Sequence, residues 1–338
     1  MTLHRHQLDG QFVVTRDRNQ IPEGWHVRTH GPWTVAAHPG LPVAEVTDPS
    51  GEFAGWVIGY PISAEGELAP GRLIFDPSLS AQGADAASAF VHSLSGRFAA
   101  VLMYRNWNRF YLDSGGTLPA VYARDLPVIA STITLIETGQ DDWDYELQHL
   151  LGMPESDLWY PAGLTPRHTI RRLLPNHYLD LDAWVSVRHW PTESHFTVDR
   201  SFEDAVGHIV ERLTRTILSV AQRYPLQLSL TAGRDTRMIL ACSKSILDRI
   251  KFHTGVWVPS GMDSEVASQI ARRFRLNHVT YRIEMANPEQ LADWQIRVGH
   301  CVSGEIWRIH PTSRKFDAHR AFLPGVAGEV GRGYYWRE

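Results

Sequence analysis

The pattern of apolar residues changes after Trp190-Pro191, and this change constrains the fold more than any other feature. A long amphipathic helix pattern begins at Ser201, and strand and helix patterns then alternate over 226–283. Strands that alternate with helices form right-handed βαβ crossovers and a mostly parallel sheet. The C-terminal half is therefore predicted to be an α/β domain that binds ligands at the carboxyl ends of its strands.

The elements of this half follow from local signals. Ser201 and Asp204 have the spacing of a capping box, with Asp in place of the commoner Glu, and they open the long helix. The later elements are expected to be a strand at 226–230, a helix at 235–246, a strand at 250–256, a helix at 263–273 and a strand at 279–283.

The N-terminal half has a different pattern. Between Gly10 and about Ile136, short β-branched and aromatic runs are separated by Gly, Pro, Asp and Asn, which is typical of strands. One helix candidate at 84–94 interrupts them, with apolar residues every three to four positions. We expect two domains, 1–190 and 191–338, in keeping with a usual size of roughly 100–200 residues per domain.

Composition excludes several classes of function. The chain has 33 Lys and Arg against 37 Asp and Glu, so no basic field attracts nucleic acid or an anionic membrane. No stretch approaches the ~20 apolar residues of a membrane-spanning helix. The two cysteines lack metal-ligand spacing and indicate buried thiols in a reducing compartment. We expect a cytoplasmic protein with small-molecule or peptide substrates, without nucleic-acid or membrane partners.

The turn at 231–236 is the strongest candidate for a functional loop. It joins the carboxyl end of a predicted strand to the amino end of a predicted helix, where unpaired backbone N–H groups attract anions. Ala232 and Gly233 are small enough for a phosphate to approach the backbone. Further hydrogen bonds to phosphate oxygens are expected from the hydroxyls of Ser229, Thr231 and Thr236.

Asp235 is out of place beside a phosphate, since a carboxylate repels it. A Mg²⁺ ion that bridges the two removes the conflict, because magnesium prefers hard oxygen ligands. We therefore predict that Asp235 binds Mg²⁺ and that Arg237 neutralises a departing pyrophosphate. The alternative is an ordinary strand-to-helix turn whose Asp and Thr cap the helix. The loop matches neither the Gly-Lys-Ser/Thr phosphate loop nor the Gly-x-Gly-x-x-Gly fingerprint.

With these residues in place, the loop resembles the Ser-Gly-Gly-x-Asp-Ser loop of the asparagine synthetase family. Other stretches resemble the family in the same order along the chain: 94–99, 112–119 with Tyr122, 129–131, 174–179, 261–265 and 325–334. They cover most of the chain, and their order is more specific than any single motif.

The resemblance implies an N-terminal αββα glutaminase-like domain of the Ntn type over 1–190. It is followed by a mostly parallel α/β ATP pyrophosphatase (PP-loop) domain over 191–338 that is C-terminally short. The implied activity is that of an AMP-forming ligase, which uses Mg-ATP to adenylate a carboxylate and transfers the acyl group to ammonia or an amine. The residues implied in ATP binding are Ser229, Thr231, Ala232, Gly233, Arg234, Asp235, Thr236, Arg237, Asp263 and Gly325.

The same resemblance implies catalytic roles for Asp235 and Glu329 as the Mg²⁺ ligands, and Arg332 is a third catalytic candidate, although it departs from the family. Glu329 stands near the family's Ala-Asp-Glu after a one-residue gap. Arg332 replaces an apolar or small residue and can hold a phosphate or a substrate carboxylate. For Asp263, which opens a predicted helix together with Glu265, a simple helix cap is the alternative.

Two further departures affect the expected activity. Thr2 stands where the family's glutaminases have a nucleophilic Cys, and a hydroxyl is a much weaker nucleophile than a thiol. We therefore expect a structural first domain without glutaminase activity. The sequence stops at Glu338, where family members continue with a helical portion. An alternative function is thus a catalytically inactive or half-site subunit, acting as a binding or scaffold protein completed by a partner chain.

Overall fold

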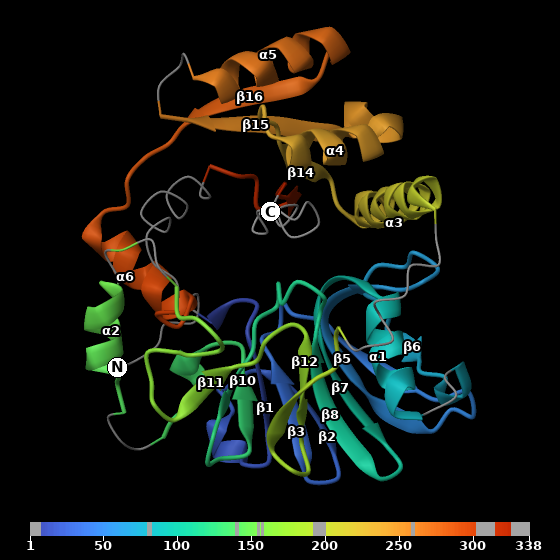
Figure 1. The fold of residues 1–338 in the computed structure, drawn as a ribbon, viewed down its shortest axis with the longest axis vertical. Helices are drawn as coiled ribbons and strands as arrows, with labels where there is room; N and C mark the ends of the chain where they lie inside the picture. The colour runs from blue at the N-terminus through green and yellow to red at the C-terminus, as the bar shows by residue number, and fades with distance from the viewer. Residues whose placement is uncertain are drawn as a thin grey trace. The chain divides into compact units, whose positions relative to one another are not determined.

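The computed structural model describes residues 8–79, 83–138, 142–153, 156, 159–191, 201–257, 261–301 and 315–325. The protein is a mixed α/β protein with three sheets, one of them parallel. Its chain divides into two compact units (Figure 1). The described residues of Met1–Val198 and Ala292–Gly304 belong to the first unit, and those of Asp199–Leu291 and Glu305–Glu338 to the second. The described part of the segment Ala292–Gly304 thus belongs to the first unit.

The first unit contains two sheets. The strands of the six-stranded sheet are β1 Phe12–Thr15, β2 His26–His30, β3 Trp33–Ala37, β9 Val121–Ala123, β10 Val128–Ala130 and β11 Ile170–Arg172, in the order β11-β9-β10-β1-β3-β2. Those of the seven-stranded sheet are β4 Val43–Thr47, β5 Phe53–Ile62, β6 Arg72–Ile74, β7 Ser95–Tyr104, β8 Trp107–Leu112, β12 His177–Asp180 and β13 Val185–Arg188, in the order β13-β12-β8-β7-β5-β4-β6. The pairs are antiparallel except for the parallel pair β4–β6.

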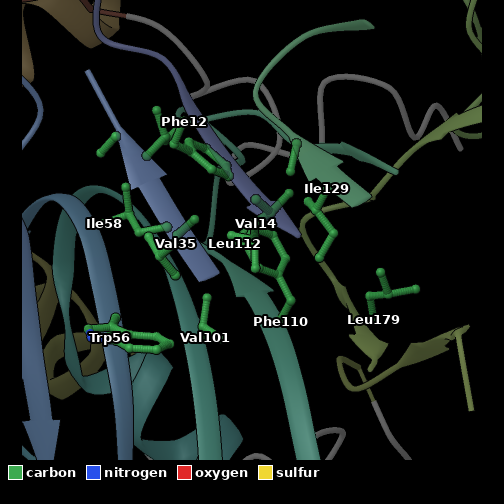
Figure 2. Close-up of a cluster of buried hydrophobic side chains, with 14 of the residues drawn as sticks. Phe12, Val14, Val35, Trp56, Ile58, Val101, Phe110, Leu112, Ile129 and Leu179 are labelled. Atoms are coloured by element: carbon green, nitrogen blue, oxygen red, sulfur yellow. The ribbon is translucent and has the colours of Figure 1, made fainter. Parts of the chain in front are cut away.

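The two sheets pack face to face through a shared apolar core (Figure 2). Phe12 and Val14 of β1 belong to this core together with Phe110 and Leu112 of β8. The rings of Phe12 and Phe110 stack with centroids 6.0 Å apart. Successive side chains of a strand point to opposite faces, so Val13 packs on the other side of the sheet.

The outer faces of both sheets are also covered. On the seven-stranded sheet, Ala87 and Val91 of helix α1 (Gly83–Ser93) pack against Phe98 and Leu102 of β7. This double coverage explains why the central strands β5 and β7 are mostly apolar instead of alternating with polar residues. The outer face of the six-stranded sheet is covered mainly by residues outside the α-helices. Helix α2 (Tyr145–Leu151) comes after most of these residues in the sequence.

The segment after helix α6 (Pro288–Arg297) completes the outer core of the six-stranded sheet. Cys301 is 7% exposed and packs in the same cluster as Ile133. Gly299 has a positive φ of 60°, and a Cβ there would lie 3.0 Å from the backbone nitrogen of Ile133. Burial raises the pKa of the Cys301 thiol to about 12, so it stays protonated. Both cysteines of the chain are free and buried, as predicted.

The turn after β8 is organised by one buried carboxylate. Asp113 is 3% exposed, and its oxygens accept five hydrogen bonds of 3.0–3.3 Å. The donors are the amides of Phe98, Gly115, Thr117 and Leu118 and the hydroxyl of Thr117. A buried carboxylate that accepts this many bonds fixes the turn, because each donor would otherwise be desolvated without a partner.

The second unit is built on a four-stranded parallel sheet with the order β16-β15-β14-β17. Its elements are α3 Phe202–Arg223, β14 Leu226–Ser229, α4 Arg234–Cys242, β15 Ile250–Val256, α5 Met262–Phe274, β16 Asn277–Arg282 and β17 Ala321–Leu323. The prediction of a parallel α/β sheet in this half is confirmed. Helix α5 packs on β15 and β16 (Figure 1).

Local signals account for most of the helix ends in this unit. Ser201 is the N-cap of α3, and its hydroxyl oxygen accepts a hydrogen bond of 3.1 Å from the amide of Asp204. Helix α4 ends at Cys242, four residues earlier than predicted, because the Ser243 hydroxyl donates to the carbonyl of Ile239 and a 3-10 segment follows. Among the described helices, none has the length and apolar character to cross a bilayer.

We predict that Asp113→Asn lowers the free energy of unfolding of the first unit by about 2–4 kcal/mol, since an amide group cannot accept all five bonds. Chemical denaturation followed by tryptophan fluorescence measures this change. Asp125→Asn, at an exposed position of the same unit, serves as the control and should change stability by less than about 0.5 kcal/mol. Equal stability of the two variants would contradict the role given to Asp113.

Candidate functional site

The strand order of the second unit marks the position at which open parallel sheets form a ligand-binding crevice. From β14, the chain adds β15 and β16 on one side, and β17 pairs with the opposite edge of β14. The direction of winding therefore reverses between β14 and β17. In open parallel sheets, ligands bind at such a reversal, outside the carboxyl ends of the strands. The segments that leave these two ends are the turn at 231–236 and Pro324-Gly325.

The base of the turn is held from both sides. The amide of Leu230 donates to the carbonyl of His253 at 2.8 Å, which extends the ladder between β14 and β15 by one residue. The Thr254 hydroxyl donates to the carbonyl of Leu230 at 2.6 Å. Because that hydroxyl proton is used, the Thr254 oxygen accepts from Nε2 of His278 at 2.8 Å. The chain leaves the sheet at Thr231.

Two threonine hydroxyls close the turn. The Thr236 hydroxyl donates to the carbonyl of Gly233 at 3.2 Å, so its oxygen accepts from the Thr231 hydroxyl at 3.0 Å. The Thr231 oxygen in turn accepts from the amide of Gly233 at 3.0 Å. We predicted that these two hydroxyls would face a phosphate. In the structure these hydroxyls bond within the turn, because the two side chains, five residues apart in the sequence, meet across it. Their contact with a phosphate stays a prediction.

Asp263 reaches the turn from another loop. It lies in the first turn of α5, and its Oδ1 accepts a hydrogen bond of 2.8 Å from the amide of Ala232. The N-cap of α5 is Gly261, so the carboxylate of Asp263 acts across the site and not as the N-cap of its own helix. The amides of Ala232 and Gly233 are thus paired within the protein and do not point outward unpaired.

Gly325, in the segment after β17, lies against the same turn. A Cβ atom on Gly325 would lie 2.5 Å from Cγ2 and 2.8 Å from the backbone nitrogen of Thr236. No side chain fits in that space, so only glycine allows this approach. The structure therefore gathers the segments after β14, β15 and β17 around the start of α4.

The charged residues of the site lie in the first turn of α4. Arg234 and Arg237 are exposed, and Nε of Arg237 donates to the carbonyl of Gly233 at 3.2 Å. Asp235 lies between these two arginines in the sequence, and its side chain is half-buried. The N-cap residue Gly233 supplies no side-chain cap, so the positive end of the helix dipole faces the crevice with two nearby cations.

Some predicted site residues fall outside the described part of the chain, namely Thr2, Glu329 and Arg332. Within the described part, the structure contains no cluster of three or more His, Cys, Asp or Glu side chains that could hold a metal. The expected partner of Asp235 in binding Mg²⁺, Glu329, is among the residues not described.

Sequence reasoning missed two buried polar residues beneath the site, Gln227 on β14 and His253 on β15. They are 0% and 4% exposed. Burial lowers the pKa of His253 to about 4, with smaller contributions from His278 and Lys251, so its imidazole is neutral. The available signal was the alternation of apolar and polar residues along both strands, Leu-Gln-Leu-Ser in β14 and Ile-Lys-Phe-His in β15, which places the polar side chains on one face.

Comparison with known proteins leaves the family open. No protein-family model matches the chain, and no curated protein matches it either. The assignment of a function therefore rests on the residues and on the geometry of the second unit.

We predict that Gly325→Ala destabilises the second unit by about 1–3 kcal/mol, because the added methyl group overlaps the start of α4. The matched control is Gly207→Ala in the exposed face of α3, where a Cβ meets nothing within 4 Å. Alanine favours the helix there and should stabilise it by roughly 0.5–1 kcal/mol. Thermal unfolding of both variants measures the difference, and a neutral Gly325→Ala would exclude the close approach.

A second prediction concerns pH. The pKa of His253 is about 4 in the folded protein, below the usual 6.5, so the unfolded chain binds the extra proton more readily. The stability that this histidine contributes is complete above pH 6.5 and is lost as the pH falls towards 4, by on the order of 3 kcal/mol. His253→Phe should show a shallower loss of stability over this range. Parallel curves for the two proteins would show that His253 does not titrate this way.

Proposed function

We propose that the second unit binds Mg-ATP at the start of α4 and that the protein is an AMP-forming carboxylate–amine ligase of the asparagine synthetase type. One observation carries this proposal: segments from three separate strand ends converge on one helix start. Asp263 bonds to Ala232, and Gly325 lies against Thr236. These are the three loops of the second unit in which the sequence resembles the family.

The geometry favours a phosphate ligand. The helix dipole of α4 gives its amino end a partial positive charge, and Arg234 and Arg237 add full charges in the same turn. Gly233 and Gly325 keep side chains away from the backbone at this point. The internal bonds of Thr231 and Thr236 fix the turn before any ligand arrives, so binding requires little ordering of the loop.

Asp235 supports the magnesium part of the proposal. It is the carboxylate in the first turn of α4, next to the place where the phosphates would lie. A carboxylate at that place would weaken phosphate binding unless a cation separates the two charges, and Mg²⁺ binds through one or two carboxylates together with substrate phosphates. Glu329 is the second ligand that the resemblance implies. The magnesium ion would neutralise charge on the phosphates.

The proposed reaction has two steps. A carboxylate oxygen of the substrate attacks the α-phosphorus of ATP, and the bond from this phosphorus to the pyrophosphate oxygen breaks. The nitrogen of ammonia or an amine then attacks the acyl carbon, AMP leaves, and the nitrogen loses a proton. The first step is needed because a free carboxylate is a poor electrophile. The cationic side chains Arg234 and Arg237 would stabilise the departing pyrophosphate, and Arg332 would hold a phosphate or the substrate carboxylate.

The first unit fits a structural role in this proposal. Thr2 replaces the nucleophilic Cys of the family, so we propose that the unit hydrolyses no glutamine and that the nitrogen comes from free ammonia or an amine. The expected location is the cytoplasm, and the carboxylate donor is a small molecule or a peptide. The alternative is a half-site subunit that a partner chain completes. The following experiment distinguishes it from the active ligase.

We predict that purified protein with Mg²⁺ exchanges labelled pyrophosphate into ATP in the presence of a suitable carboxylate. Asp235→Asn should reduce this exchange by at least about 100-fold, because it removes the charge that holds the metal ion. Asp248→Asn is the matched control, since Asp248 is an exposed aspartate of the same unit in the segment after α4. It should leave the exchange unchanged.

The other outcomes are also informative. Tight Mg-ATP binding without exchange across a broad panel of carboxylates would favour the half-site subunit. A failure to bind Mg-ATP would overturn the proposed function altogether. Release of ammonia from glutamine by the wild type, and its loss in Thr2→Ala, would overturn the structural role of the first unit.

A further inference from the structure

A line of buried polar groups runs beneath the start of α4, along one face of the parallel sheet. The backbone amide of Asp317, just before β17, donates to Oε1 of Gln227 at 3.3 Å. Nε2 of Gln227 lies 3.3 Å from Nδ1 of His253, and Nε2 of His253 lies 3.2 Å from Oγ of Ser229. Ser229 is the last residue of β14, two positions before the turn.

The hydrogen bond from the Asp317 amide determines the direction of the other hydrogen bonds in this line. A backbone N–H can only donate, so the Asp317 amide identifies the oxygen end of the Gln227 side chain. The other end of that side chain is therefore the NH₂ group, which donates to Nδ1 of His253. Since Nδ1 accepts, the proton of the neutral imidazole is on Nε2, and Nε2–H donates to Ser229.

Protonation of His253 would break this line, because Nδ1 would then carry a hydrogen that faces the NH₂ group of Gln227. The surroundings oppose protonation as well. The rings of Phe316 and Phe322 lie 4.6 Å and 5.5 Å from the imidazole, and that of Tyr281 lies 5.8 Å away. The cations Lys251 and protonated His278 would repel a histidinium ion. The imidazole therefore stays neutral, and its Nε2–H group remains the donor to Ser229.

The register of the sheet explains how these side chains meet. Gln227 pairs with Lys251 and Ser229 with His253 in the parallel ladder of β14 and β15. Side chains of neighbouring strands in register share one face of a sheet, so Gln227, Ser229 and His253 point to the same side. Leu226 and Leu228 point to the opposite side, into the core that the helices cover.

We propose that Gln227 and His253 are positioning residues that orient the Ser229 hydroxyl towards the phosphate-bearing ligand. The Ser229 oxygen accepts from His253, which leaves its own proton to be donated on the side of the turn. This inference rests on the proposed function, because it assigns the ligand of Ser229 to the Mg-ATP site. It adds two residues that act through Ser229 and do not contact the ligand themselves.

The test measures Mg-ATP affinity by calorimetry, without a carboxylate substrate, for the wild type and a set of variants. Ser229→Ala should weaken binding by about tenfold, the effect of one hydrogen bond to a charged group. His253→Phe keeps an aromatic ring among Phe316 and Phe322 but lacks the donor, and it should weaken binding to a similar extent. His253→Gln retains an N–H donor and should stay within about threefold of the wild type.

The double variant with Ser229→Ala and His253→Phe separates positioning from packing. If His253 acts through Ser229, the double variant binds no more weakly than either single variant. Independent, additive losses would overturn the proposal, and so would equal losses for His253→Phe and His253→Gln. Unfolding midpoints of all variants show which of them are folded.

The tautomer of His253 gives a readout that needs no ligand. Nitrogen-15 NMR of the full chain at pH 7 should show His253 neutral and protonated at Nε2, and Gln227→Leu should reduce this preference. A histidine protonated at Nδ1 in the wild type would overturn the proposal. Mg-ATP binding without the expected coupling between His253 and Ser229 would overturn this inference alone. Absence of Mg-ATP binding by the wild type would overturn the proposed function. In that case the tautomer of His253 decides whether the hydrogen-bonded line exists.

Discussion

The parallel pairing of β14 on both of its edges is the constraint on which the second unit depends. A strand paired on two sides cannot shift its register without breaking both ladders. Its carboxyl end is therefore fixed between those of β15 and β17, and the turn at 231–236 begins at a defined point. The alternation of side chains along the strand then decides that Leu228 enters the core of the helices and that Ser229 points towards His253.

The turn itself is held by hydrogen bonds that would be lost in a looser loop. Thr231 and Thr236 bond to each other across it, and the carboxylate of Asp263 accepts from Ala232. When a site is ordered before its ligand binds, less of the binding free energy is lost in ordering its groups. The same arrangement explains why glycine stands at position 325: a Cβ atom there would lie 2.8 Å from the backbone nitrogen of Thr236.

Much of the second unit could be predicted from the sequence, because helix and strand periodicities are local signals. The strand at 250–256 was predicted with the bounds that the structure shows, and Ser201 is the N-cap of α3, as predicted. The partners of the polar side chains could not be predicted. The bond between Asp263 and Ala232 joins residues 31 positions apart, and no local pattern encodes such a contact. His253 was overlooked for the same reason, since its role depends on the register of two strands.

The first unit is made from two separate stretches of the chain, and this has a consequence for its synthesis. On the ribosome, the residues up to Val198 emerge first, and their two sheets can begin to pack as soon as they are exposed. The outer core of the six-stranded sheet must wait for Cys301, which is made about a hundred residues later, after most of the second unit. The nascent first unit therefore carries an open apolar face through that interval, and the second unit also stays incomplete until β17, which is made after Cys301.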